Sequence, residues 1–160
     1  MIMLFRKEKN MWNSRKSTVC SLVCTRIFIV LLILCAVFLP RIIEFYAGYA
    51  FNAPDSAGLF PLKVVLYMCC IPAAAALVCL DRMLTDIRKG EVFTSRNVRL
   101  LRIISWSCFA AAAMLLAAGK YYILFLCAAA IAAFIGLILR VVKNVIEEAS
   151  EIKNENDYTI

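Results

Sequence analysis

The cysteines are the residues of this 160-residue chain whose type could do the most chemistry, because thiols bind metals and exchange disulfides. The chain has eight cysteines and no histidine, and no two cysteines have the Cys-x-x-Cys spacing of metal and redox motifs. Cys20 and Cys24 lie one helical turn apart and are interpreted as free thiols. The other six lie in apolar runs, where cysteine acts as a small apolar side chain. We therefore predict no metal site and no cofactor.

Paired carboxylates are the other residues that could do chemistry. Glu44 and Asp55 follow the first apolar run, in a connection rich in aromatic residues. General acid–base catalysis requires carboxylates in a held geometry, and aromatic residues are enriched at membrane interfaces for their amphipathic rings alone. We predict no catalytic residues and a protein that is not an enzyme.

The composition indicates what kind of fold must position these residues. Apolar residues make up 64% of the chain, against about 45–50% in soluble domains. The net charge of +7 comes from residues that flank apolar runs and do not line one polar face, as a nucleic-acid-binding surface would require. A soluble fold and direct nucleic-acid binding are therefore excluded from the prediction.

Four apolar runs are long enough to cross a bilayer, which takes about 20 residues of helix for about 30 Å of hydrocarbon. None of them contains Asp or Glu. We predict an all-α fold, an integral membrane four-helix bundle with up-down topology. Residues 1–21 form a basic N-terminal segment and residues 22–160 the membrane domain. Its predicted spans are residues 22–40, 59–80, 101–118 and 121–139, followed by a cytoplasmic helical tail over residues 140–154.

The distribution of Lys and Arg predicts the orientation, because cytoplasmic flanks retain them. Fifteen of the 18 basic residues lie in residues 1–26, in residues 81–102 or in the tail. The connections at the other side of the membrane, between the first and second and between the third and fourth spans, have only Arg41, Lys63 and Lys120 in or beside them. Both termini are therefore expected in the cytoplasm. The first apolar run is expected to stay in the protein, because it is longer than the core of about 7–15 residues of a cleaved signal peptide.

The connection between the second and third spans has the residues of an ordered turn. Gly90 is a natural helix stop, and Thr94 has the side chain of a helix N-cap. Phe93 and Val98 have the spacing of a hydrophobic staple. We expect this connection to fix how the chain enters the third helix.

Two sets of residues are candidate contact sites. A partner or anionic lipid could contact the basic entry of the third helix and the acidic tail, at Arg96, Arg99, Arg102, Glu147 and Glu151. Plain anchoring by positive charge and a solvated helix face are the simpler interpretations of these charges. A helix-packing face is predicted on the fourth helix at Ala128, Ala132 and Gly136, either within the chain or between copies.

The segment Gly90 to Arg102 reads GEVFTSRNVRLLR, and the chain ends in NDYTI. With the four spans, these motifs resemble a bacterial membrane family catalogued as domain of unknown function 2975. Tyr158 departs from the leucine that the family ending would have. The resemblance implies a bacterial cytoplasmic (inner or plasma) membrane location and no established activity, substrate or catalytic residue. It also implies a small helix-turn-helix regulator encoded beside many members.

These observations leave three functional hypotheses. The first is a non-enzymatic multi-pass membrane component, in contact with the lipid bilayer, that binds a small cytosolic DNA-binding regulator through residues 81–102 and 140–160. The alternative is a homo-oligomeric small-solute permease or channel, although ionisable residues inside the apolar runs are sparse. The third, a four-helix thiol oxidoreductase, would need reactive cysteine pairs in the outer connections, which contain none.

Overall fold

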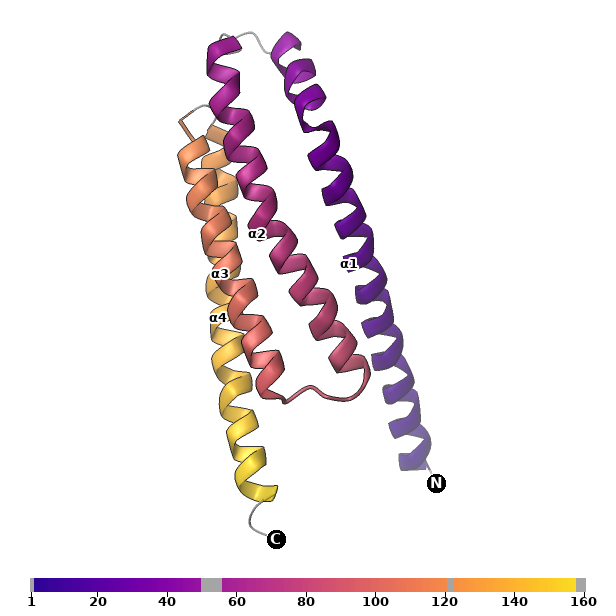
Figure 1. Ribbon diagram of the computed structural model, residues 1–160. Coiled ribbons are helices and arrows are strands. Elements are labelled where there is room, and N and C mark those ends of the chain that lie inside the picture. Colours follow the sequence, from indigo (N-terminus) through magenta and orange to yellow (C-terminus); the bar gives the residue numbers. More distant parts are fainter. Residues whose placement is uncertain (1, 50–55, 121–122, 158–160) are drawn as a thin grey trace.

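The chain folds into four α-helices. The computed structural model describes the backbone of residues 2–49, 56–120 and 123–157 and the side chains of residues 16–45, 60–120, 123–152 and 155. The helices are α1 (Ile2–Tyr49), α2 (Ser56–Arg88), α3 (Ser95–Ala118) and α4 (Ile123–Asp157). In this part of the chain the fold is entirely helical, and consecutive helices run in opposite directions (Figure 1).

Each helix contains a stretch long and apolar enough to cross a membrane. α3 has 24 residues, which at 1.5 Å per residue gives a length of about 36 Å, close to the thickness of a bilayer core. α1 has 48 residues and α4 has 35, so both exceed what a bilayer core requires. α1 continues from the basic N-terminal segment into the first apolar run without a break, and α4 extends past the predicted end at residue 154.

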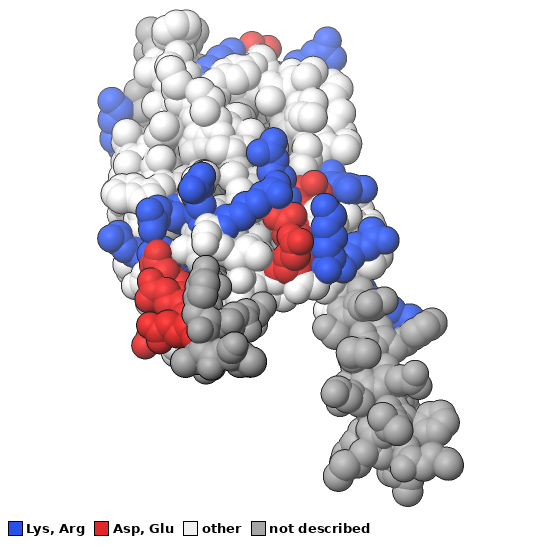
Figure 2. All heavy atoms as spheres, turned by 60° about the horizontal axis from the view of Figure 1, so that its bottom comes forward, with Lys and Arg blue, Asp and Glu red and all other residues white. Residues whose placement is uncertain are grey.

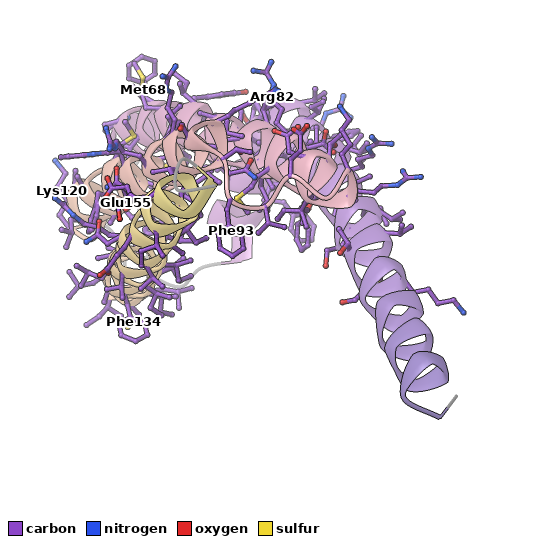
Figure 3. The ribbon with its side chains drawn as sticks, turned by 90° about the horizontal axis from the view of Figure 1, so that it is seen from below. Met68, Arg82, Phe93, Lys120, Phe134 and Glu155 are labelled. Carbon is purple, nitrogen blue, oxygen red and sulfur yellow. The ribbon has the colours of Figure 1, made fainter. Side chains whose placement is uncertain are left out.

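The helices form an open curved row in which, among the described residues, only consecutive helices contact one another. α1 contacts α2, α2 contacts α3, and α3 contacts α4 (Figures 1 and 3). The predicted four-helix bundle is correct in helix number, but a closed bundle would also bring α4 against α1. Lipid tails are as apolar as leucine, so no hydrophobic force closes the row in a membrane.

Ion pairs join α1 and α2 near both ends of their contact. The Arg26 Nε lies 3.2 Å from the Asp81 carboxylate, and the Lys63 Nζ lies 2.9 Å from Glu44 at the opposite end. Between these levels the exposed surface of α1 is largely apolar. Arg26, which lies inside the first predicted span, is therefore paired at the margin of the apolar zone.

Among the described residues, α3 contributes more buried side chains than any other helix, because it lies between α2 and α4. The α3–α4 contact is close at Gly136, where a Cβ atom would meet the Cys108 Cβ at 3.3 Å and the Phe109 ring at 3.4 Å. The Ser105 hydroxyl donates to the Gly136 carbonyl oxygen at 2.8 Å. A glycine on α4 thus lets a hydroxyl of α3 reach the backbone of the neighbouring helix.

Candidate functional site

The turn between α2 and α3 lies at the end of the molecule where both termini also lie, called here the charged end (Figure 1). Gly90 has a φ of 90° and its N–H donates to the Ile87 carbonyl at 3.0 Å. The Glu91 N–H donates to the Asp86 carbonyl at 3.1 Å. These bonds cap the last carbonyls of α2, and the positive φ explains why a glycine ends this helix, as the sequence predicted.

The side chain of Asn97, in the first turn of α3, holds the same turn by hydrogen bonds. This side chain is 2% exposed, and its Nδ2 donates to the carbonyl oxygens of Glu91 at 2.6 Å and Val92 at 3.0 Å. The Asn97 N–H donates to the Thr94 Oγ1 at 3.4 Å, so Thr94 is the N-cap of α3 as predicted. One buried amide therefore satisfies two loop carbonyls and joins them to the first turn of α3.

Arg96 also joins α2 to α3, through an ion pair with Asp86. Its Nε lies 3.4 Å from the Oδ2 of Asp86, whose side chain is 5% exposed. A buried carboxylate needs a partner charge, and Arg96 supplies it from the first turn of α3. Sequence reasoning had grouped Arg96 with Arg99 and Arg102, but the structure directs it toward α2.

A groove between α3 and α4 carries most of the other candidate residues. Its lower pocket, nearest the charged end, has a volume of about 240 Å³ and is lined by Ser95, Val98, Arg99, Arg102, Glu147, Ser150 and Glu151. Its upper pocket has a volume of about 280 Å³ and is lined by Arg102, Ser105, Trp106, Arg140, Lys143 and Asn144. The lining residues recur every three or four positions, so each helix presents one face to the groove.

Arg102 and Glu147 divide the groove into these two pockets. The Arg102 Nη2 lies 3.3 Å from the Glu147 Oε1, and the Lys143 ammonium donates a short hydrogen bond to Glu147 Oε2. The hydrogen bond from Lys143 lowers the pKa of the Glu147 carboxyl, and the charges of Lys143 and Arg102 act in the same direction. Glu147 is therefore a carboxylate held between two cations from two helices.

Aromatic side chains border the upper pocket on the side of the apolar surface. The Arg140 guanidinium lies 5.9 Å from the centre of the Trp106 ring. Trp106 in turn meets Phe109 edge-on, with ring centres 6.3 Å apart. A cation over an exposed indole is the arrangement expected where a helix leaves the apolar zone.

Figure 2 shows Lys and Arg side chains in a band across the charged end, with Asp and Glu between and beyond them. The structure thus brings Arg99, Arg102, Glu147 and Glu151 together in the lower pocket. Sequence reasoning missed Arg140, Lys143 and Asp86 as members of these clusters. The sequence places only Gly119 and Lys120 between the predicted third and fourth spans, and this short connection could have indicated the α3–α4 register that joins them.

The predicted helix-packing face is only partly directed at a neighbouring helix. Gly136 is buried against α3, whereas Ala128 and Ala132 are half-buried. Ala129, beside them, is 1% exposed. The contact of α4 with α3 therefore runs through Ala129 and Gly136.

The residues considered first for chemistry lie apart from the groove. All eight cysteines are free thiols, and most of them are on the spans. No group of three or more Cys, Asp or Glu that could hold a metal ion occurs in the part of the chain that the structure describes. Glu44 pairs with Lys63, while Asp55 lies outside the described residues. The groove offers cations, carboxylates and hydroxyls, which suits recognition of a charged group.

Comparison with known proteins gives one match. The family model described as "Protein of unknown function (DUF2975)" matches residues 17–160. No curated protein and no solved structure gives a significant match. The match covers most of α1, all of α2, α3 and α4, the α2–α3 turn with Gly90, Thr94 and Asn97, and the groove. The chain therefore belongs to the DUF2975 family of proteins of unknown function.

Proposed function

We propose that this protein is a non-enzymatic multi-pass membrane component whose charged end binds a small cytosolic regulator of the helix-turn-helix class. The observation that carries the proposal is the lower pocket, where Arg99 and Arg102 of α3 lie beside Glu147 and Glu151 of α4. Opposite charges from two helices beyond the apolar zone form a surface that a partner can recognise by complementary charge.

The order of this surface supports the proposal. The α2–α3 turn is held by Asn97, and the Arg102–Glu147 pair joins the beginning of α3 to the extension of α4. A surface with a fixed shape loses little conformational entropy when a partner binds. The family resemblance adds the partner class, because it implies a small helix-turn-helix regulator encoded beside many members.

The proposal requires the charged end to face the cytoplasm of a bacterial cell. The count of Lys and Arg supports this orientation, with fifteen of 18 at that end. Fusions at the C-terminus test it: we expect a fluorescent protein to fold and an alkaline phosphatase to remain inactive. An active phosphatase would place the charged end outside and exclude a cytosolic partner.

The binding experiment uses the tagged full-length chain, co-expressed with a small helix-turn-helix protein of the kind that the family resemblance implies and purified in mild detergent. We expect co-elution from the native chain, and loss of it after deletion of residues 150–160 or in Arg99→Glu. Arg82→Glu is the matched control: Arg82 belongs to the predicted contact region of residues 81–102, but it does not line the lower pocket and is exposed on α2, away from α4 (Figure 3). Absence of co-elution from the native chain would contradict the proposal.

The permease or channel remains the alternative function, with weaker support. A homo-oligomer would use the small residues of α4, but Gly136 already contacts α3 of the same chain. Ala128 and Ala132 are half-buried, so only these two residues of the predicted helix-packing face remain for contact with a second copy. Solute flux into liposomes containing the purified protein would favour this alternative over the regulator-binding function.

A further inference from the structure

The upper pocket lies where the exposed surface of α3 and α4 changes from apolar to charged. On one side of it, Leu137 is 54% exposed and Trp106 is 61% exposed. On the other side, the groove continues into the charged lower pocket through Arg102. In a bilayer this change of surface coincides with the headgroup layer, whichever way the protein is oriented.

The charge of the upper pocket is one-sided. Three of its six lining residues are cationic, namely Arg102, Arg140 and Lys143, and none is acidic. Glu147 at its lower border is paired with Arg102 and Lys143. Arg140 makes no ion pair with a described residue and stacks on Trp106. Three cations next to one carboxylate give this group of residues an excess of two positive charges.

Asn144 adds a neutral donor to the three cations. Its side-chain amide lines the pocket and can donate to phosphate oxygens, whereas the single hydroxyl hydrogen of Ser105 is already used on the Gly136 carbonyl. Guanidinium groups bind phosphate oxygens in pairs, and an ammonium adds a point charge. The volume of about 280 Å³ accommodates a phosphate group together with ordered water.

We propose that the upper pocket binds the phosphate group of an anionic phospholipid, with Arg140 and Lys143 on the phosphate and Trp106 beside the first acyl-chain carbons. Glu147 acts as an internal anion that holds Arg102 and Lys143 when no lipid is bound. An incoming phosphate competes with that carboxylate for the same two cations. This ligand differs from the proposed protein partner, and the site does not depend on that partner.

Tryptophan fluorescence gives a direct test, because the chain has only two tryptophans, Trp12 and Trp106. The Trp12→Phe full-length chain is reconstituted in bilayers that contain brominated phosphatidylglycerol or brominated phosphatidylcholine. Bromine on the acyl chains quenches Trp106 when that lipid occupies the pocket. We expect phosphatidylglycerol to quench at several-fold lower mole fraction than phosphatidylcholine.

Substitutions inside and outside the upper pocket test whether the pocket causes the preference for phosphatidylglycerol over phosphatidylcholine. Arg140→Gln and Lys143→Gln are each expected to reduce the preference for phosphatidylglycerol about fivefold, the effect of one basic residue near anionic lipid. Arg82→Gln, which removes an exposed charge from α2 at the same end, should leave the preference unchanged. Glu147→Gln should raise it, because the competing carboxylate is gone. An equal loss in Arg82→Gln and Arg140→Gln would overturn the proposal, since the attraction would then be general.

A second arm separates lipid phosphate from free phosphate. Inorganic phosphate is added to the protein in phosphatidylcholine bilayers, with chloride at the same ionic strength as the control, and Trp106 fluorescence is recorded. A change with phosphate, together with equal quenching by the two brominated lipids, would overturn the lipid as the ligand and assign the pocket to free phosphate. Equal quenching without any phosphate effect would overturn the site altogether.

Discussion

The side-chain amide of Asn97 lies 2.6 Å from the carbonyl oxygen of Glu91, and this bond joins the turn after α2 to the first turn of α3. The same nitrogen reaches the Val92 carbonyl at 3.0 Å. Because the side chain is 2% exposed, water does not replace these bonds easily. The groove residues of α3 begin at Ser95, so the direction of α3 at the groove depends on this buried amide.

Asn97→Ala should lower the free energy of unfolding by about 1–3 kcal/mol, because two buried carbonyls lose their donor. Titration with sodium dodecyl sulfate, followed by circular dichroism, measures this difference. Asn144→Ala is the control: Asn144 is an exposed asparagine on α4, and its replacement should change stability by less than about 0.5 kcal/mol. Equal effects of the two substitutions would show that the buried amide has no special role.

Gly90→Ala should destabilise the α2–α3 turn by about 1 kcal/mol through its backbone conformation alone. The φ of Gly90 is 90°, and a Cβ atom there would meet nothing within 4 Å. The strain should appear as faster cleavage of the turn by a protease added to the purified protein. Gly90→Asn should be milder, because asparagine tolerates positive φ better than alanine. A cleavage rate for Ala below that for Asn would contradict this explanation.

Gly136→Leu should separate α3 from α4, because its Cβ would already lie 3.3 Å from the Cys108 Cβ. Overpacking of this kind costs about 1–3 kcal/mol. Ala130→Leu adds a similar volume on an exposed face of α4 and serves as the control. Unfolding in sodium dodecyl sulfate measures both, and a Gly136→Leu chain as stable as the Ala130→Leu chain would refute the close contact.

The Glu147 carboxylate should make stability depend on pH in the acid range. Its pKa is lowered in the folded protein by the hydrogen bond from Lys143, so the folded state binds this proton less readily than the unfolded state. The stabilisation is present above the ordinary pKa of 4.5 and is lost as pH falls through the lower folded pKa. The melting temperatures of the native chain and of Glu147→Gln are measured from neutral to acid pH. We expect the native chain to be the more stable at neutral pH and the two melting temperatures to converge at acid pH. A difference that persists there would contradict this assignment.

Local sequence signals predicted the elements around the turn. Gly90 ends α2 and Thr94 caps α3, as their side chains indicated, because both effects act within a few residues. The partners of Arg96, Arg99 and Arg102 were harder to predict, because residues close in sequence on a helix point in different directions around its axis. At 3.6 residues per turn, Arg96 and Arg102 point about 120° apart, so Arg96 meets Asp86 of α2 and Arg102 meets Glu147 of α4.

Predicting the upper pocket would have required the alignment of α4 along α3, which the sequence indicates only indirectly. Arg140 and Lys143 were counted as ordinary basic residues of the tail, although the short predicted connection at Gly119 and Lys120 requires the fourth helix to run antiparallel to the third. The Ser105–Gly136 hydrogen bond shows that alignment. The openness of the helix row could not be predicted, since four apolar helices are compatible with closed and open packing alike.

The open row has a consequence for biosynthesis. Among the described residues each helix contacts only its neighbours in sequence, so these interfaces join segments that leave the ribosome one after the other. Such local contacts close short loops and are formed early. α2 can dock on α1, α3 on α2 and α4 on α3 in the order of translation, so that the groove between α3 and α4 is the last interface to assemble.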